Sequence, residues 1–513
     1  MTTIAIPRRP HRGRIHCLGA IPLALLLAAC TSVTNPVSGQ RELTVMDEQA
    51  EIAEGKKAHA GVLAEYGVVK DAKLQAYVDE LGQKLAKSSQ RANLQWTFTV
   101  LDSPEVNAFA TPGGYVYVTR GIMATMESEA DLAGVIGHEI GHVTARHGAQ
   151  RATRQQAAGI GVLAASVLGA VAEAYGVPGA GQLVGQASQG AAAGYIASYS
   201  RDQELQADRL GADYLVRNHY DPKNMVDVIG VLKMQEQFAA DQARAAGRQP
   251  RQGGDWLASH PSNEQRLDAI KATAAGYAKS AAPGTYADDG RERYLQAIGG
   301  MVYGSSREQG VVRGPNFYHE PLGIALTAPA GWRIQNGQDA VALVNAAGDA
   351  GLVLKTVPAK AGSSHEEIIR SLIQPTQGKV EKRSLNGLAA SHFVGQRQNQ
   401  QGQSQPVQAT IVTGPANSNY LLLYAAKDAA ARERALPQLR EAEASFRAMS
   451  AADRKAAEPW TIRAVPYPRG GFAELAKRSP LQPAELAERQ LRLINGVYGG
   501  GEPKPGQLVK IID

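Results

Sequence analysis

Hydrophobic residues recur first at helical and then at strand spacings along the first third of the chain. From Asp47 to Lys87 the pattern is largely helical, since Leu63 and Tyr66 are three residues apart and Leu74, Tyr77, Leu81 and Leu85 follow at steps of three and four. Leu94 to Leu101 alternates apolar and polar residues, and Tyr115 to Thr119 is rich in Tyr and Val, so both stretches are predicted strands. A second strong helix is predicted from Glu127 to Gly148. This pattern indicates a mostly helical domain that contains a small antiparallel sheet.

Short strands alternate with helices in the second half of the chain, between Phe317 and Phe446. The predicted strands are Gly323 to Ala328, Ala340 to Val344, Gly351 to Val357, Ala409 to Thr413 and Tyr420 to Ala425, and the predicted helices lie near residues 364–374 and 428–448. This is the pattern of an α+β domain built on an antiparallel sheet. Gly, Ala and Ser concentrate after Ala274, so a linker is predicted over residues 276–310. The fold class predicted for the whole chain is α+β.

Residues 155–200 are rich in Ala, Gly, Val and Leu and contain a single charge, Glu173. The uncharged residues 155–172 lie at the lower edge of the length that spans a bilayer. Small residues and the break at Gly176-Val177-Pro178-Gly179 favour close-packed helices or a lid that touches the membrane. A true membrane span is the alternative.

The first 30 residues have the pattern of a bacterial lipoprotein signal. A basic stretch from Arg8 to Arg14 precedes the apolar run Leu18 to Ala29, which is too short to cross a membrane. The run ends in Leu27-Ala28-Ala29-Cys30, which resembles the lipobox at which a lipid is added to the cysteine. An ordinary signal peptide or an uncut anchor is the alternative. Residue 31 is Thr rather than Asp, which by resemblance to lipoprotein sorting rules favours the outer membrane. We therefore expect a periplasmic protein that Cys30 anchors in the inner leaflet of that membrane.

Charge and cysteine content agree with this location. The arginines of the signal contribute most of the formal charge of +6, so the mature chain is nearly balanced and gives no reason to expect a nucleic-acid partner. Cys17 lies in the segment that would be removed, which leaves Cys30 alone and acylated. The mature protein is therefore predicted to have no disulfide although its compartment is oxidising.

The predicted helix from Glu127 to Gly148 contains His138-Glu139-Ile140-Gly141-His142. Histidines at i and i+4 lie on one helix face, so both can bind one zinc ion at about 2.0–2.1 Å. Glu139 can then take a proton from metal-bound water. The preferred interpretation is a site for one zinc ion per chain. The alternative is that the two histidines lie on one helix by chance and bind no metal. His147 lies about 140° round the helix from His142, so it is predicted to face elsewhere.

A catalytic zinc also needs a third protein ligand. Glu204 and Asp208 are again four residues apart on a predicted helix from Arg201 to Val216. One of these carboxylates can bind the metal, and the other can accept the ring N–H of a ligand histidine and fix its tautomer. Ordinary ion pairs on a charged helix face are the alternative, but the upstream motif favours Glu204 as the ligand.

Four motifs in order resemble the gluzincin peptidases of the HtpX, BepA and CAAX-prenyl-protease group. They are Asn107-Ala108-Phe109-Ala110-Thr111-Pro112-Gly113-Gly114, His138 to His142, Glu204 to Asp208, and His260-Pro261 with Arg266. The resemblance covers about residues 35–275. It implies that His138, His142 and Glu204 bind zinc and that Glu139 is the general base.

The same resemblance implies a substrate site. The strand from Gly114 to Thr119 is expected to offer its edge to an extended substrate. The residues expected at this substrate site are Asn107, Ala110, Gly114 and Tyr115.

His260 and Arg266 are candidates for a donor to the oxyanion that forms during hydrolysis. In BepA-like members the matching histidine can occupy the fourth zinc position and keep the enzyme inactive. For His260 three interpretations stay open, namely such a switch, an oxyanion donor and a structural His-Pro turn. Catalytic roles are accordingly assigned to Glu139, Asp208, His260 and Arg266, with His260 also a possible fourth ligand.

The end of the chain has an order of features like that of a LysM module. A strand from Ile462 to Val465 is followed by helices at Phe472 to Ala476 and Ala484 to Leu493, and by a closing apolar stretch that ends at Ile512. The usual Gly-Asp-Thr after the first strand is replaced by Arg469-Gly470-Gly471. Peptidoglycan is therefore only a possible partner.

The sequence as a whole predicts a membrane-anchored periplasmic zinc endopeptidase that cleaves envelope proteins in quality control. The alternative is a zinc-containing lipoprotein without proteolytic activity that acts as a chaperone or peptidoglycan-binding adaptor. The predicted domains are a signal peptide (1–29), a tether (30–46), the metallopeptidase domain (47–275), the linker (276–310), an α+β accessory domain (311–450) and a LysM-like unit (459–513).

Overall fold

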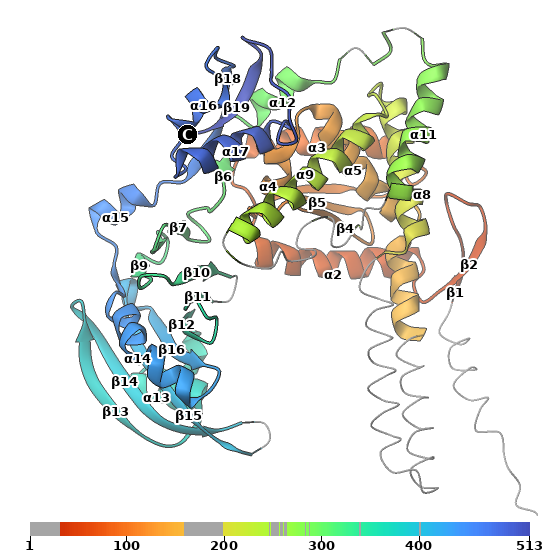
Figure 1. The fold of residues 1–513 in the computed structure, drawn as a ribbon. Helices are drawn as coiled ribbons and strands as arrows, with labels where there is room; N and C mark the ends of the chain where they lie inside the picture. Colours follow the sequence, from red (N-terminus) through yellow and green to blue (C-terminus); the bar gives the residue numbers. More distant parts are fainter. Residues whose placement is uncertain are drawn as a thin grey trace, which may run out of the picture.

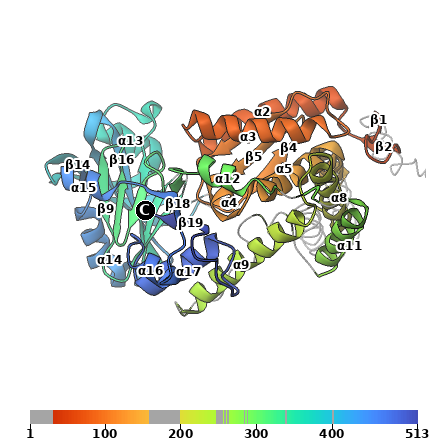
Figure 2. The ribbon, with the colours of Figure 1, turned by 90° about the horizontal axis from the view of Figure 1, so that it is seen from above.

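The computed structural model describes residues 31–513 except 158–198, 246, 248–255, 257–259, 261–263, 283, 287, 338–339 and 400–401. The described residues form two lobes joined by short connections, with the C-terminal elements beside the first lobe (Figures 1 and 2). Helices and several separate sheets are both present, which confirms the predicted α+β class. The signal segment, Cys30 and most of residues 155–200 lie outside the described residues.

The first lobe is mostly helical and contains one small sheet. Its helices are α2 (Glu48–Tyr66), α3 (Ala72–Lys87), α4 (Arg120–Thr125), α5 (Glu129–Thr144), α8 (Arg201–Arg217), α9 (Asn224–Ala245) and α11 (Glu264–Ser280). Its strands are β3 (Thr97–Leu101), β4 (Ala108–Thr111) and β5 (Tyr115–Thr119), in the order β3-β5-β4. The sheet is mixed and not antiparallel as predicted, because β3 pairs with β5 in parallel and only β4 pairs with it antiparallel.

Glycines let α5 and α8 approach each other closely. A Cβ atom at Gly137 would lie 3.3 Å from the Cα of Gly211, and one at Gly141 would lie 3.0 Å from the carbonyl oxygen of Ala207. Contacts this short leave no room for a side chain between the two helices. The glycine inside the His-Glu-x-x-His motif therefore helps to bring α8 against the face of α5 that carries the histidines.

The active-site helix α5 ends earlier than predicted, at Thr144. Arg146 adopts a left-handed backbone with φ of 61°, and a new helical segment covers residues 147–157. Buried charges support this break, since Arg146 Nε lies 3.2 Å from Glu51 Oε2 and Arg91 donates to Val143 O at 3.0 Å. The break changes the direction of the chain directly after the zinc motif.

Residues 31–44, predicted as part of a tether, form an antiparallel hairpin of β1 (Thr31–Thr34) and β2 (Arg41–Thr44). Asn35, in the turn, donates to Ala145 O at 3.1 Å. The hairpin therefore contacts the end of α5.

The predicted linker 276–310 differs from the structure. Within it, α12 (Arg291–Ala297) contributes Tyr294 and Leu295 to the core of the first lobe, and β6 (Val302–Tyr303) pairs with a C-terminal strand. Tyr294 is fully buried. These residues were missed because Gly, Ala and Ser dominate the composition around them and the buried apolar positions are few.

The second lobe contains two antiparallel sheets. The smaller has the order β17-β9-β8-β7, from β17 (Arg447–Ala448), β9 (Ile324–Thr327), β8 (Asn316–His319) and β7 (Val311–Arg313). The larger has the order β10-β11-β12-β16-β15-β14-β13, from β10 (Arg333–Asn336), β11 (Val341–Val344), β12 (Ala350–Thr356), β16 (Asn419–Ala426), β15 (Ser404–Thr413), β14 (Leu388–Gln398) and β13 (Pro375–Leu385). Helix α13 (His365–Ile373) packs on one face of the larger sheet and α14 (Ala429–Ala444) on the other, with separate apolar clusters beneath them.

A buried carboxylate lies between the large sheet and α14. Glu443 accepts hydrogen bonds from Tyr424 Oη at 2.8 Å, from Arg383 Nη2 at 2.5 Å and from Thr410. Burial by itself would raise the pKa of Glu443, but these bonds, with His392 and the charge of Arg383, lower it to about 2. A carboxylate with a depressed pKa stabilises the folded state at pH values above its ordinary pKa.

Acid is therefore expected to lower the stability of the second lobe, because Glu443 becomes protonated. As the pH falls from about 5 to about 2, the free energy of unfolding should decrease by about 3 kcal/mol, because the unfolded state takes up the proton first. Urea unfolding followed by Trp332 fluorescence at several pH values measures this. Glu443→Gln should start less stable and lose the acid dependence, whereas Glu441→Gln, at an exposed position, should keep it. Equal acid dependence in both variants would contradict the assignment.

The C-terminal elements follow the predicted order, with β18 (Trp460–Pro466), α16 (Gly471–Ala476), α17 (Ala484–Ile494) and β19 (Leu508–Ile512). They dock on the first lobe through Lys510, which is fully buried. Its Nζ lies 2.9 Å from Glu127 Oε1 and donates to the backbone oxygens of Ala124 and Met126. The resemblance to LysM stays a prediction, but this unit packs against the start of α5.

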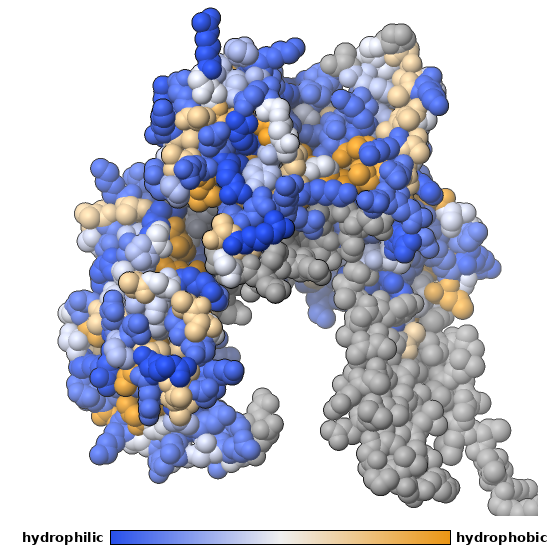
Figure 3. Space-filling model, in the orientation of Figure 1, coloured by the Kyte–Doolittle hydropathy of each residue, from blue (hydrophilic) through white to orange (hydrophobic). Residues whose placement is uncertain are grey.

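The visible surface is mostly hydrophilic, with scattered apolar areas (Figure 3). A cleft of about 690 Å³ lies between the lobes. Ser103 and Glu105 line it from the first lobe, and Phe317, Ile324 and Tyr420 line it from the second. No helix in the described part of the chain is both long and apolar enough to cross a membrane.

Candidate metal centre and active site

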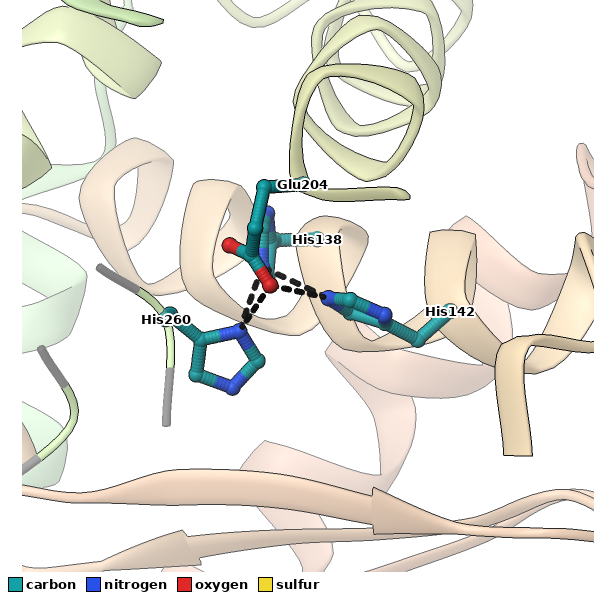
Figure 4. Close-up of side chains that lie close together, drawn as sticks. All are labelled: His138, His142, Glu204 and His260. Carbon is teal, nitrogen blue, oxygen red and sulfur yellow. Dashed lines mark hydrogen bonds and ion pairs between the residues drawn. The ribbon is translucent and has the colours of Figure 1, made fainter. Parts of the chain in front are cut away.

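Four buried side chains from three parts of the chain point toward one another (Figure 4). His138 and His142 come from α5, Glu204 comes from α8, and His260 lies just before α11. His138 Nε2 is 3.0 Å from His142 Nε2 and 3.1 Å from His260 Nδ1. Glu204 Oε1 is 3.0 Å from His260 Nδ1 and 3.5 Å from His142 Nε2.

These distances fit a zinc ion. Four donors at about 2.0–2.1 Å from a tetrahedral zinc are about 3.3 Å apart, close to the distances between these atoms. One candidate ligand atom from each residue lies within 4.8 Å of the others. Three imidazole nitrogens and one carboxylate oxygen are also a ligand set that zinc prefers. The four residues could therefore hold one zinc ion per chain, and His260 supplies the fourth candidate ligand atom.

The electrostatics of the cavity favour a positive charge. Glu139 and Glu204 are both buried and both face His260. Burial alone would lower the pKa of His260, but these two carboxylates outweigh it and raise the pKa. The same carboxylates would stabilise a metal cation at this position.

Asp208 orients His138, as the spacing on α8 predicted. His138 Nδ1 lies 2.9 Å from Asp208 Oδ1, on the side of the ring away from the other ligands. Arg266 Nε and Nη2 donate to the two oxygens of Asp208 at 2.5 and 2.8 Å. Burial would raise the pKa of Asp208, but Arg266 and His138 lower it. Asp208 is therefore held as a carboxylate that accepts the ring N–H of His138.

The guanidinium group of Arg266 contacts several residues of the candidate metal centre. Besides Asp208, it contacts Glu204 Oε2 at 2.9 Å and donates to the backbone oxygen of His260 at 2.9 Å. Arg266, in the first turn of α11, therefore contacts Glu204 and Asp208 of α8.

His147 does not face away from the site, and the prediction from helical angles is wrong. Its Nδ1 lies 2.9 Å from His142 Nδ1, and its Nε2 lies 2.9 Å from Gln206 Oε1. The prediction assumed an unbroken helix, whereas the left-handed Arg146 redirects the chain. Burial lowers the pKa of His147 to about 4, so the ring is neutral at physiological pH.

Glu139 lies beside the ligand cluster and is held by two side chains of the His260 segment. Trp256 Nε1 donates to Glu139 Oε1 at 3.1 Å, and His260 Nε2 lies 3.5 Å from the same oxygen. The rings of Trp256 and His260 stack at 4.6 Å. Sequence reasoning missed Trp256, because a single tryptophan in a polar loop carries no motif.

The sheet beside the site differs from what the resemblance implied. The strand from Gly114 to Thr119 cannot offer an edge, because β5 pairs with β3 on one side and with β4 on the other. Within the described residues β4 is at the edge of this sheet. Ala110 lies in β4, Asn107 directly precedes it, and Gly114 and Tyr115 lie at the start of β5.

A His-Glu-x-x-His helix with a glutamate ligand on a second helix is the centre of a gluzincin-type zinc metallopeptidase. Residues 72–274 match the model of Peptidase family M48. This part of the chain is similar to that family, and the match includes the helices that carry His138, His142 and Glu204.

Several named proteases match this chain over a length similar to that of the family match. A putative beta-barrel assembly-enhancing protease of Vibrio cholerae is 34% identical over 204 residues, which is 39% of this chain and 39% of that protein. The beta-barrel assembly-enhancing protease of Escherichia coli (strain K12) is 30% identical over 200 residues, again 39% of each. Mitochondrial metalloendopeptidase OMA1 of Arabidopsis thaliana is 31% identical over 181 residues, 35% of this chain and 32% of that protein. The chain thus matches about two fifths or less of the length of these relatives.

Among solved structures, the solution structure of cyanobacterial PsbP (CyanoP) from Synechocystis aligns with a TM-score of 0.20 at 13% identity. The alignment covers 27% of this chain and 98% of that chain. A score this low supports no conclusion about the fold of this chain.

Proposed function

We propose that the chain is a zinc-dependent endopeptidase of the bacterial periplasm that hydrolyses peptide bonds in envelope proteins. The observation that carries this proposal is the buried set of His138, His142 and Glu204 with Glu139 beside it. A purely structural zinc site would have no use for a buried glutamate at that position.

When bound, zinc supplies Lewis acidity to the scissile carbonyl and to the attacking water. Glu139 accepts a proton from that water and passes it to the leaving amine. Asp208 and Arg266 keep His138 in the tautomer that presents Nε2 to the site. The residues around the ligands are largely buried, which limits competing contacts with bulk water.

The geometry corresponds to a resting state that cannot yet hydrolyse a peptide. His260 occupies the fourth ligand position, and the indole N–H of Trp256 is bonded to Glu139. A substrate carbonyl must reach the same position, so His260 has to leave it before the reaction. Of the three interpretations of His260, the switch is the one that this geometry favours.

The substrate is proposed to be an extended polypeptide that lies along β4. This strand has one neighbour in the described sheet, and an edge strand can bind a further strand through its backbone. Ser103 and Glu105, which precede β4, also line the cleft between the lobes. A long polypeptide could therefore extend from the site into that cleft.

Location and natural substrates are inferred from the sequence and the relatives. The lipobox-like residues ending at Cys30 support attachment to the outer membrane, facing the periplasm. Relatives named beta-barrel assembly-enhancing protease support quality control of envelope proteins as the setting. Peptidoglycan binding by the C-terminal unit is a further proposal that rests on its LysM-like order of elements.

Casein cleavage by the purified full-length protein, with and without a zinc chelator, tests the function. Cleavage should occur and should stop when zinc is removed, because the ligand set has no other source of Lewis acidity. Zinc re-addition should restore it. Retained zinc with no chelator-sensitive cleavage, including in a variant that lacks the His260 side chain, would favour the alternative of a chaperone or adaptor.

A further inference from the structure

His147 and Gln206 form a second line of contacts behind the metal ligands. His142 Nε2 faces the ligand cluster, and its Nδ1 faces His147 Nδ1 at 2.9 Å. On the far side of the His147 ring, Nε2 lies 2.9 Å from Gln206 Oε1. His147 is fully buried and Gln206 lies on α8. The imidazole of His147 therefore connects a metal ligand of α5 to the helix that supplies Glu204.

Counting protons along this line determines the tautomer of each ring. If His142 binds zinc through Nε2, its proton must be on Nδ1, which then donates to His147. His147 Nδ1 must accept that bond, so the proton of the neutral His147 ring is on Nε2. That N–H donates to the amide oxygen of Gln206. Each contact then has one donor and one acceptor, and none is left without a partner.

We propose that His147 is a positioning residue of the zinc site, which holds His142 in the tautomer and ring orientation that bind the metal. It does for His142 what Asp208 does for His138, whose Nδ1 lies 2.9 Å from that carboxylate. Glu204, Gln206 and Asp208 follow one another at steps of two on α8. Helix α8 thus supplies the candidate ligand Glu204, the carboxylate that contacts His138 and the amide that contacts His147.

The chain break after α5 gives His147 this position. Arg146, with its left-handed backbone, donates to Met46 O at 2.7 Å and pairs with the buried Glu51. Asn35 of the N-terminal hairpin binds Ala145 O. An uninterrupted helix would carry His147 to a different face, so these contacts explain why the break is fixed where it is.

The test compares variants that remove or keep the acceptor for His142. His147→Phe keeps the ring shape but has no nitrogen, whereas His147→Asn can place an amide oxygen near the position of Nδ1. The zinc dissociation constant of the full-length protein in detergent is measured by competition with a chromophoric chelator. His147→Phe should weaken zinc binding by about 10–100-fold, the usual effect of losing such a contact. His147→Asn should restore most of the affinity.

Bound cobalt gives a second readout that a general packing defect would not alter. The ligand-field spectrum should change in His147→Phe and resemble that of the unaltered protein in His147→Asn. Gln206→Met should weaken zinc binding less than His147→Phe, since the direct contact with His142 remains. His219→Asn, at an exposed left-handed position, is the control and should change neither readout.

This inference rests on the proposed zinc site, and its failure can be told apart from failure of the proposed function. If the unaltered protein binds zinc but does not cleave casein, the proposed function is wrong. The role of His147 in zinc binding is then still tested by the affinity measurements. Unchanged zinc affinity and cobalt spectrum in His147→Phe would overturn the role of His147. Equal loss of affinity in His147→Phe and His147→Asn would also overturn it, because packing alone would then explain the effect.

Discussion

Replacing Glu139 by Gln is expected to slow peptide hydrolysis by about 10²–10⁴-fold while the zinc content of the protein stays the same. The amide has the shape of the carboxylate but cannot accept a proton from water. Glu139 supplies none of the four ligand atoms, so the metal centre should remain intact. Initial rates of casein cleavage and zinc content by elemental analysis, on the same preparations, measure the two effects.

The control for this variant is Glu264→Gln, which removes an exposed carboxylate from the first helical turn of α11. It should cleave casein at the rate of the unaltered protein. If Glu139→Gln also did so, Glu139 would not be the general base. If Glu139→Gln lost zinc together with activity, the buried carboxylate would instead contribute to metal binding through the charge of the cavity.

The candidate site could be predicted from the sequence to the extent that its residues follow helical spacing. His138 and His142, and likewise Glu204 and Asp208, are four residues apart, and the structure brings these pairs to one cavity. Within each pair, the shared face depends only on the regular geometry of the helix that carries it. His260 was identified through the resemblance, since nothing in its local sequence indicates a metal ligand.

Two residues of the site were not predictable in this way. His147 was assigned to the wrong face because the left-handed Arg146 is stabilised by Glu51, which lies about 95 residues earlier in the chain. Trp256 lies in a polar stretch of sequence with no periodic pattern, and its contact with Glu139 joins residues that are 117 positions apart. Both contacts are long-range, so local spacing does not determine them.

In the fold, too, features set by local sequence could be predicted and features set by long-range contacts could not. Buried strands such as β12 and β16 coincide closely with predicted strands, because their apolar residues stand out in the sequence. The hairpin β13–β14 was missed, since β13 is almost entirely exposed and its residues are mostly polar. The order in which the strands pair could not be predicted either. β5 is the central strand of its sheet, although its composition is that of any half-buried strand.

Replacing His260 by Ala is expected to weaken zinc binding and yet to accelerate casein cleavage. The variant loses one ligand of the resting metal centre, so the zinc dissociation constant should rise. It also frees the position that a substrate carbonyl must occupy. If the closed form accounts for 90–99% of the molecules, removing it should raise kcat/KM by about 10–100-fold at saturating zinc. Opposite changes in affinity and rate distinguish a switch from a residue needed for the reaction.

Trp256→Phe distinguishes the two contacts of Trp256, which are its stack against His260 and its hydrogen bond to Glu139. Phenylalanine can keep the stack against His260, which lies at 4.6 Å in the native protein, but it cannot donate to Glu139. We expect a smaller rise in kcat/KM than for His260→Ala and no change in zinc affinity, because no ligand is lost. Abolished cleavage in His260→Ala at full zinc occupancy would exclude the switch and indicate that His260 acts on the reacting groups. An unchanged rate in both variants would mean that the position of His260 in the resting state does not limit hydrolysis.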